Sequence, residues 1–436
     1  MFKKLIQKRL EKLTRKYFNK KAVKLVVVTG SVGKTTTKMA IATVLAEKYA
    51  VRVHEGNHNT HMSAPLAMLG VEYPENVHSL SAWVAVWRAV RIRLHQKDDV
   101  EVVVQELGSD QPGDIAHFGT YLKPDVAVVT AVSPEHMEFF KTLDEVAKEE
   151  LRAASFSNLT VINRDDIAEE YARYADTHTI NTYGLGAQAE YRVVLEPSSP
   201  LDGRIGKLYA QEWGELPVNL QVIGEQGVKA ATAAALVGAK LGLTSQQVAV
   251  GLSKIRPVKG RMNVLRGLEE SVLIDDTYNS SPLAVRAALS TLYSIDAPQR
   301  IAILGSMNEL GDTSAQAHEE VGHLCQSDKL DWVITIGDEA ERYLASAALS
   351  NGCQIKSFKS PYQAGGFAHS VLKPGAVILA KGSQNGVFAE EALKVLLHST
   401  EEESSLVRQS DYWLARKSEQ FAIEAVEPVP QDKQSK

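Results

Sequence analysis

Residues 25–37 join an apolar strand pattern to a glycine-containing turn, a lysine and a run of threonines, and this junction constrains the fold more than any other feature. Gly30 and Gly33 allow backbone N–H groups to approach phosphate oxygens closely. Lys34 can bridge the β- and γ-phosphates, and the hydroxyl of Thr35 can face Mg²⁺ at the start of a helix. The junction therefore predicts an ATP site formed by Thr29, Gly30, Ser31, Val32, Gly33, Lys34, Thr35 and Thr36.

Composition places the chain among ordinary globular proteins. Its 436 residues are 44% hydrophobic and 23% charged, which is enough for two or three domains with substantial cores. Cys325 and Cys353 are too few for a disulfide scaffold or a four-thiolate zinc site, and no signal peptide or apolar run of membrane-spanning length is apparent. The net charge of −5 does not indicate nucleic-acid binding. We expect a cytoplasmic protein without a nucleic-acid partner.

Strand-like and helical patterns alternate along most of the chain, which predicts the α/β class. In the first half the strand patterns lie at 25–29, 101–106, 125–130 and 159–162, with a small antiparallel excursion over 178–222. In the second half they lie at 271–275, 300–304, 331–336 and 375–380. We expect a central P-loop mononucleotide-binding domain with a mostly parallel sheet over 23–256 and a C-terminal Rossmann-like α/β domain over 257–398.

Both ends of the chain differ from these domains. The first 24 residues hold ten Lys or Arg against the single acid Glu11, with apolar residues at helical spacing, so 1–22 predicts a basic amphipathic helix. Such a helix packs on the neighbouring domain or contacts an anionic membrane surface, and both interpretations stay open. Residues 399–436 predict a polar tail whose first half is partly ordered.

Two further side chains follow strand patterns. Glu106 ends the strand at 101–106, and His136 follows the strand at 125–130. Because open α/β sheets bind ligands at the carboxyl ends of their strands, we expect both side chains beside the P-loop. A carboxylate there can hold Mg²⁺, and an imidazole can bind a second metal ion.

Several motifs occur in an order that narrows the interpretation. The first half contains Gly56-Asn57-His58-Asn59, Glu106-Leu107-Gly108 and His136 with Glu138. The second half contains Gly260-Arg261-Met262, Asp275-Asp276-Thr277-Tyr278-Asn279, Asn308-Glu309-Leu310-Gly311 and Lys381-Gly382-Ser383. Together with the P-loop they resemble the Mur ligase family, and those of the second half resemble its MurF type, over roughly residues 25–397.

The resemblance implies an ATP-dependent amide-bond ligase of peptidoglycan synthesis that forms an acyl-phosphate intermediate. Enzymes of this type act on small molecules, joining D-alanyl-D-alanine to a UDP-muramoyl tripeptide. By resemblance, Arg261 reaches the ATP phosphates, Asp276 takes the ribose hydroxyls and Tyr278 lies beside the nucleotide. Two Mg²⁺ ions are implied, with ligands at Thr35, Glu106 and His136, and catalysis at Lys34, Glu106, His136 and Arg261. The residues expected to meet the other substrates are Asn57, Asn59, Asn279, Asn308, Glu309 and Lys381.

The chain departs from the family pattern in two places that bear on chemistry. Many of these ligases carbamoylate a lysine to supply a carboxylate, and the matching position is Glu150, with Lys148 two residues earlier. These two positions lie about 200° apart around a helix, so only one faces the metal, and we favour Glu150 over Lys148. About 24 residues precede the P-loop strand, so we expect this chain to lack the UDP-binding domain that MurF-type enzymes carry.

The sequence-based hypothesis is therefore a MurF-like ligase that adds D-alanyl-D-alanine or a similar amine to a UDP-muramoyl peptide. One alternative is a ligase of another acid, as in poly-γ-glutamate or folylpolyglutamate synthetases. A second alternative, from a different class, is a nucleotide-binding scaffold that has lost catalysis. Phosphate release that depends on both an acid and an amine would separate the enzyme from the scaffold.

Overall fold

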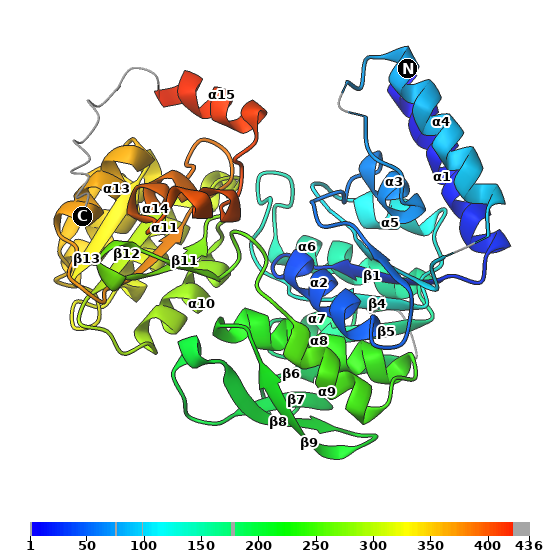
Figure 1. Ribbon diagram of the computed structural model, residues 1–436, viewed down its shortest axis with the longest axis horizontal. Helices are drawn as coiled ribbons and strands as arrows, with labels where there is room; N and C mark the ends of the chain where they lie inside the picture. Colours follow the sequence, from blue (N-terminus) through cyan, green and yellow to red (C-terminus); the bar gives the residue numbers. More distant parts are fainter. Residues whose placement is uncertain (1, 75, 98, 176–178, 422–436) are drawn as a thin grey trace, which may run out of the picture.

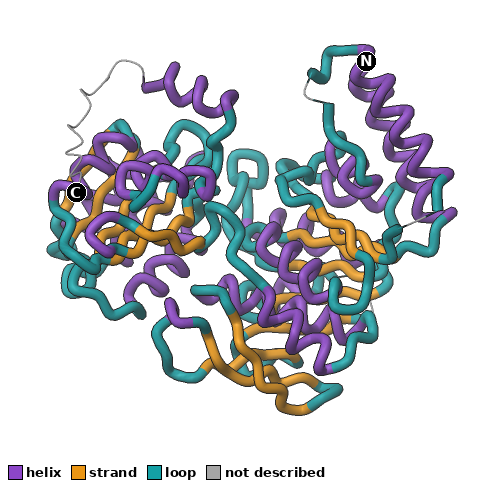
Figure 2. The backbone as a smooth tube through the Cα atoms, viewed as in Figure 1, coloured by secondary structure: helices purple, strands orange, loops and turns teal. Residues whose placement is uncertain are grey.

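The computed structural model describes residues 2–74, 76–97, 99–175 and 179–421. Two β-sheets, each covered by helices, form two lobes (Figure 1). A cleft lined by residues of both lobes lies between them. The tube view shows the helices lying on both sides of the strands in each lobe (Figure 2). The α/β class predicted from the alternating patterns is confirmed.

The first lobe is built on a nine-stranded sheet with the order β2-β3-β1-β4-β5-β6-β7-β8-β9. Neighbouring strands from β2 to β7 are parallel, so their carboxyl ends share one edge of the sheet. The strands are β1 (Lys24–Thr29), β2 (Val51–Val53), β3 (Val102–Glu106), β4 (Val126–Val129), β5 (Leu159–Asn163), β6 (Ile180–Gly184), β7 (Tyr191–Leu195), β8 (Arg204–Ala210) and β9 (Gly214–Leu220).

Alternate residues of β1 face opposite sides of this sheet, and both sides are buried. Val26 and Val28 pack under α2 and α8, while Leu25 and Val27 pack under α1, α3, α4 and α5. The helices of this lobe are α1 (Phe2–Lys20), α2 (Lys34–Leu45), α3 (Ser63–Leu69), α4 (Leu80–His95), α5 (Asp114–Gly119), α6 (Leu143–Glu150) with a 3₁₀ turn (Leu151–Phe156), α7 (Glu169–Ala172), α8 (Gly224–Lys240) and α9 (Ser245–Lys254).

The antiparallel excursion predicted for 178–222 differs in part from the structure. β6 pairs with β7 in parallel, and only the pairs β7–β8 and β8–β9 are antiparallel. These strands extend the main sheet instead of forming a separate unit. The sequence pattern identified short strands but could not show which edge they join, because pairing of distant strands is set by tertiary packing.

The second lobe is built on a six-stranded sheet with the order β10-β11-β15-β12-β13-β14, parallel except for β10. Its strands are β10 (Asn263–Arg266), β11 (Val272–Asp276), β12 (Arg300–Gly305), β13 (Trp332–Ile336), β14 (Ile355–Phe358) and β15 (Val377–Lys381). Its helices are α10 (Pro282–Tyr293), α11 (Ser314–Leu324), a π-helix (Ala340–Ala345) that continues into α12 (Ser346–Ser350), α13 (Pro361–Ser370) and α14 (Glu390–Leu396).

The segment predicted to be a polar tail begins with a 3₁₀ helix (Thr400–Ser405) and α15 (Asp411–Phe421). Lys417 anchors α15, because its ammonium lies buried against Glu390 at 2.9 Å and Glu391 at 2.5 Å. The rest of the predicted tail, 422–436, lies outside the described residues. No helix in the described part of the chain has both the length and the apolar character needed to cross a bilayer.

Candidate active site

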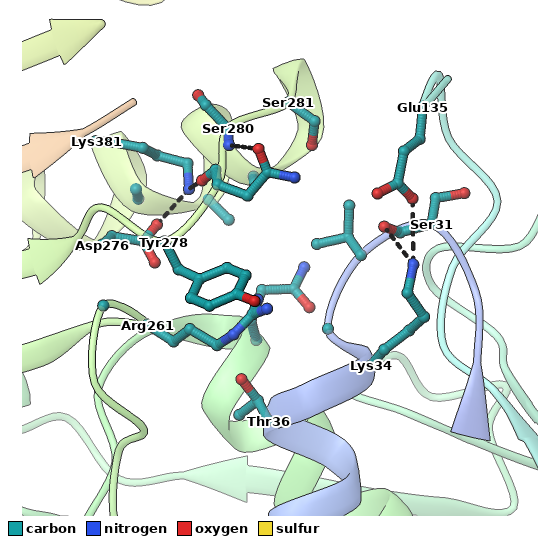
Figure 3. A pocket seen from close by; sticks show the side chains of 18 of the residues that line it. Ser31, Lys34, Thr36, Glu135, Arg261, Asp276, Tyr278, Ser280, Ser281 and Lys381 are labelled. Carbon is teal, nitrogen blue, oxygen red and sulfur yellow. Dashed lines mark hydrogen bonds and ion pairs between the residues drawn. The ribbon is translucent and has the colours of Figure 1, made fainter. Parts of the chain in front are cut away.

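The cleft beside the P-loop lies between the two lobes and has a volume of about 330 Å³, within the range of small-molecule sites. The first lobe lines it with the P-loop and the loops that follow β3 and β4. The second lobe lines it with Arg261, Asp276, Tyr278 and Lys381, which face the P-loop across the opening (Figure 3). Residues far apart in the chain therefore converge on one cavity.

The P-loop has the backbone geometry that its glycines predict. Gly30 has φ 120° and Gly33 has φ 88°, values that side chains other than glycine rarely adopt. A Cβ at Gly30 would lie 2.8 Å from the backbone nitrogen of Ala131, so the segment that follows β4 packs too closely for any larger residue. α2 begins at Lys34, and its first N–H groups point toward the cleft end of the helix.

Lys34 extends into the loop itself. Its ammonium donates to the carbonyl oxygens of Gly30 at 2.5 Å and Ser31 at 3.3 Å, and it lies 3.3 Å from the Glu135 carboxylate (Figure 3). Burial lowers the pKa of Lys34, but the carboxylates of Glu135, Glu150 and Glu106 outweigh that effect and hold the pKa above its ordinary value. The ammonium is therefore charged and placed where a phosphate would meet it.

Glu135 was not identified from the sequence, although it directly precedes His136. Burial raises the pKa of Glu135, and the attraction of Lys34 offsets that rise only in part. The ion pair with Lys34 therefore does not fully compensate the Glu135 carboxylate for its loss of hydration. Phosphate oxygens could replace this carboxylate as the partner of Lys34 at low electrostatic cost.

Glu106 lies at the centre of a polar cluster at the end of β3. Its carboxylate accepts hydrogen bonds from the Thr35 hydroxyl at 2.8 Å and the Asn59 amide at 3.1 Å. The ammonium of Lys38 lies 3.7 Å away, and burial lowers the pKa of Lys38. The sequence predicted that Thr35 and Glu106 would meet, but it gave no signal for Lys38, one helical turn beyond Lys34.

Arg261 connects the two lobes. Its guanidinium donates to the Thr35 hydroxyl at 3.1 Å and stacks on the Tyr278 ring with the Cζ atom 4.3 Å from the ring centre. The Arg261 Nε atom is buried and has no hydrogen-bond partner within the described residues. An unpartnered cationic donor in a cleft is the group that an anion would satisfy.

Asp276 and the buried Lys381 form an ion pair on the second lobe. The Lys381 ammonium lies 2.6 Å from the Asp276 carboxylate and donates to the carbonyl oxygen of Asn279 at 2.9 Å (Figure 3). Asp276 also accepts the backbone N–H of Met262 at 3.2 Å. Both side chains line the cleft, and the pair holds the backbone after β11 in place.

His136 meets the second lobe directly. Its Nδ1 atom lies 2.8 Å from the Glu309 carboxylate, and its Nε2 atom lies 3.7 Å from Asp110 and 3.8 Å from Glu135. Burial lowers the pKa of His136, whereas the hydrogen bond to Glu309 and the charge of Glu135 raise it. The second effect is larger, so the pKa of His136 lies above its usual value. His136 and Glu309 have φ values of 51° and 65°, which marks both loops as conformationally constrained.

Glu150 and Lys148 lie in different surroundings, as their helical spacing predicts. The buried Glu150 carboxylate accepts hydrogen bonds from the Thr29 hydroxyl, the Gly30 N–H at 2.7 Å and the Ser109 hydroxyl at 2.6 Å. Lys148 is more than half exposed and pairs with Asp144 at 2.6 Å, outside the cleft. The structure therefore brings Glu150 to the P-loop and does not bring Lys148 there.

Some of the remaining predicted residues line the cleft, and others lie behind its lining. The cleft is lined by Ser31, Val32, Gly33, Thr36, Asn57, Asn59, Asn279 and Asn308, as well as by Gln226 at the start of α8. Thr29, Gly30 and Thr35 lie behind the lining and make the hydrogen bonds described above. Asn308 is fixed by its N–H, which donates to the Ser383 hydroxyl at 2.9 Å, and by its side-chain amide, which donates to the Asn385 carbonyl oxygen at 2.7 Å.

The donor set at the P-loop fits Mg²⁺, which prefers a few protein oxygens together with substrate phosphates. The Thr35 hydroxyl and the Glu106 carboxylate supply such oxygens 2.8 Å apart. No group of three or more His, Cys, Asp or Glu within the described residues is arranged to hold a metal ion by itself. A metal at this site would therefore need phosphate oxygens to complete its coordination.

The cleft combines a P-loop from the first lobe with an arginine from the second. This combination defines a nucleotide-binding protein whose site is formed by two lobes. The Mur ligase middle domain matches residues 28–238, and the Mur ligase glutamate ligase domain matches residues 260–384. The chain belongs to the Mur ligase family.

Individual relatives support the same assignment. The UDP-N-acetylmuramoyl-tripeptide–D-alanyl-D-alanine ligase of Bacillus subtilis is 27% identical over 89% of this chain and 79% of its own length. The enzyme of that name from Haemophilus influenzae is 29% identical over 83% and 74%. The crystal structure of the MurF ligase from Thermotoga maritima in complex with ADP superposes with a TM-score of 0.72 at 26% identity, covering 89% of this chain and 83% of that chain.

Proposed function

We propose that this chain is an ATP-dependent, ADP-forming ligase of the MurF type, which joins D-alanyl-D-alanine to the carboxylate of a UDP-muramoyl tripeptide in peptidoglycan synthesis. The observation that carries the proposal is the meeting of Arg261 with Thr35 at 3.1 Å, because it places a second-lobe cation at the phosphate end of the P-loop. The likeness to MurF enzymes along most of the chain supports the same substrates.

The reaction has two steps. A carboxylate oxygen of the acid substrate attacks the γ-phosphorus of ATP, the bond to the β-phosphate oxygen breaks, and ADP leaves an acyl phosphate. The amine then attacks the acyl carbon, and the C–O bond to phosphate breaks to give the amide and inorganic phosphate, while the amine loses a proton. Because phosphoryl transfer depends mainly on position and charge, Lys34 and Arg261 can act by holding the phosphates in line.

Thr35 and Glu106 are the residues that would hold Mg²⁺, which neutralises phosphate charge when bound. We place a second ion beside His136, whose Nε2 atom faces carboxylates of Asp110 and Glu135. Glu150 then supplies a buried carboxylate without carbamoylation. Its three hydrogen bonds also fix the first N–H of the P-loop, so its contribution includes positioning the loop.

The remaining roles follow the cleft lining. We assign the ribose to Asp276, the purine side to Tyr278, and the acid and amine substrates to Asn57, Asn59, Asn279, Asn308, Glu309 and Lys381. Closure of the second lobe over the first would exclude water from the acyl phosphate, which otherwise hydrolyses.

The test is phosphate release from ATP with a UDP-muramoyl tripeptide, with D-alanyl-D-alanine, with both and with neither. We expect release only when both are present, and the amide product by mass spectrometry. Glutamate with a γ-glutamyl acid forms the contrast arm. The proposed substrates would be wrong if phosphate were released only with glutamate and the γ-glutamyl acid. They would also be wrong if phosphate release did not depend on the amine.

A further inference from the structure

Helices α1 and α4 lie side by side at the outer edge of the first lobe, away from the cleft (Figure 1). They run in the same direction, because the guanidinium of Arg9 lies 4.8 Å from the centre of the Trp87 ring and Lys20 donates to the carbonyl oxygen of Leu94 at 3.3 Å. The two helices thus present a continuous outer surface along the line of the Arg9–Trp87 contact.

Helical spacing shows which residues share that surface. Side chains three, four or seven positions from Arg9 and Trp87 lie on the same sides of their helices. We define the α1–α4 strip as Leu5, Arg9, Lys12 and Lys16 of α1 with Leu80, Val84, Trp87 and Arg91 of α4. Its aliphatic members are well exposed, with Leu5 at 62%, Leu80 at 69% and Val84 at 47%.

The charge of the strip has one sign. α4 carries three arginines and no carboxylate. The single acid of α1, Glu11, is turned inward and lies 2.7 Å from the ring of His117 on α5. An anionic partner would therefore meet no carboxylate from either helix on this surface.

Of the two interpretations of residues 1–22, packing on the neighbouring domain agrees with the structure. Ile6, Leu10 and Tyr17 are buried against the first lobe, so they cannot enter a bilayer. The apolar residues at helical spacing in this segment are Leu5, Ile6, Leu10, Leu13 and Tyr17, and Leu5 is the exposed one among them. Lipid contact by α1 must therefore come from its outer side, which belongs to the strip, and α4 supplies most of the exposed apolar side chains there.

We propose that the α1–α4 strip binds the surface of an anionic phospholipid bilayer. Its lysines and arginines meet lipid phosphates, and the exposed side chains of Leu5, Leu80 and Val84 enter the headgroup region. Basic side chains and exposed aliphatic groups on one helical surface are the combination that interfacial binding needs. The strip lies outside the cleft, so this binding is independent of the proposed ligase reaction.

Co-sedimentation with phosphatidylcholine vesicles, with and without phosphatidylglycerol, tests the proposal on the full chain. We expect binding only with phosphatidylglycerol, weakened by salt. The variant Lys12→Glu/Lys16→Glu/Arg91→Glu should lose about tenfold or more in partition coefficient. The variant Leu5→Ser/Leu80→Ser/Val84→Ser should lose several-fold. Substitutions are used because removing α1 would uncover apolar surface under Leu10 and Tyr17 and cause spurious vesicle binding.

A matched control reverses three exposed charges on the second lobe, Lys329→Glu/Arg342→Glu/Lys356→Glu, and should bind vesicles as the wild type does. Thermal unfolding of each variant checks that the fold is intact. Equal binding by the wild type and either strip variant would overturn the proposal, as would equal binding to both kinds of vesicle. Binding to duplex DNA without binding to vesicles would assign the strip to nucleic acid instead.

Discussion

The guanidinium of Arg408 donates a hydrogen bond of 3.0 Å to the carbonyl oxygen of Tyr278. It also donates to the carbonyl oxygen of Thr277 at 2.6 Å and lies 2.6 Å from the buried carboxylate of Glu390. The segment after residue 399 therefore fixes the backbone that carries Tyr278, whose ring stacks under Arg261. The segment predicted from the sequence to be a polar tail therefore supports the part of the cleft that is expected to bind the nucleotide.

We expect Arg408→Lys to raise the KM for ATP about three- to tenfold with a smaller effect on kcat, because lysine cannot make the forked contacts of arginine. Steady-state kinetics at varied ATP measure this. The matched variant is Lys417→Met, which breaks the same buried network without touching the 277–278 carbonyls. It should lower the free energy of unfolding by about 3–5 kcal/mol and leave the KM unchanged. If the KM for ATP changed equally in both variants, Arg408 would contribute to the stability of the fold and not specifically to ATP binding.

Lys34→Ala should lower kcat about 30- to 1000-fold, which corresponds to about 2–4 kcal/mol of lost transition-state stabilisation. The reason is the loss of a charged donor that already lies among P-loop carbonyl oxygens. Single-turnover measurements with saturating ATP isolate the phosphoryl-transfer step. Retention of wild-type rates would contradict the placement of phosphates at this loop.

Glu150→Gln should reduce kcat strongly, because the amide removes the negative charge beside the P-loop and turns the acceptor of the Ser109 hydroxyl into a donor, a disturbed buried hydrogen bond of about 1–3 kcal/mol. Lys148→Ala should leave turnover unchanged, since Lys148 pairs with Asp144 at the surface. Both variants are assayed for amide formation under identical conditions. An active Glu150→Gln enzyme together with an inactive Lys148→Ala enzyme would reverse our choice between the two residues.

Burial raises the pKa of Asp275 to about 6, although hydrogen bonds from Thr277 act in the opposite direction. The folded state thus binds this proton more tightly than the unfolded chain does. The contribution of Asp275 to stability is fully present below about pH 4 and is lost as the pH rises through 6. Urea unfolding of the wild type and Asp275→Asn should show a difference that changes by roughly 3 kcal/mol from about pH 4 to about pH 7. Parallel pH profiles would exclude this assignment.

Sequence patterns identified the parts of the fold that local signals encode. The glycines of the P-loop, the valine-rich strands and the residues at strand ends predicted the nucleotide side of the cleft, because parallel strands bring their carboxyl ends to one edge. Short elements such as β2 and β14 gave no pattern long enough to detect. The pairing of β6 with β7 likewise depends on tertiary contacts.

The same limit applied to the site. No local motif predicts the contacts of Lys38, Glu135 and Arg408, because each of these residues meets a partner more than 65 positions away in the chain. Glu150 was found only because family spacing pointed to its position, and its hydrogen bonds to Thr29 and Ser109 became visible only in three dimensions.

In the described part of the chain the backbone passes from the first sheet to the second once, over residues 255–262, and Arg261 lies at the second-lobe end of that connection, just before β10. A swing of one lobe against the other would turn about this short connection, beside the hydrogen bond between Arg261 and Thr35. The joint on which the cleft would open therefore lies next to the start of α2, where the P-loop ends.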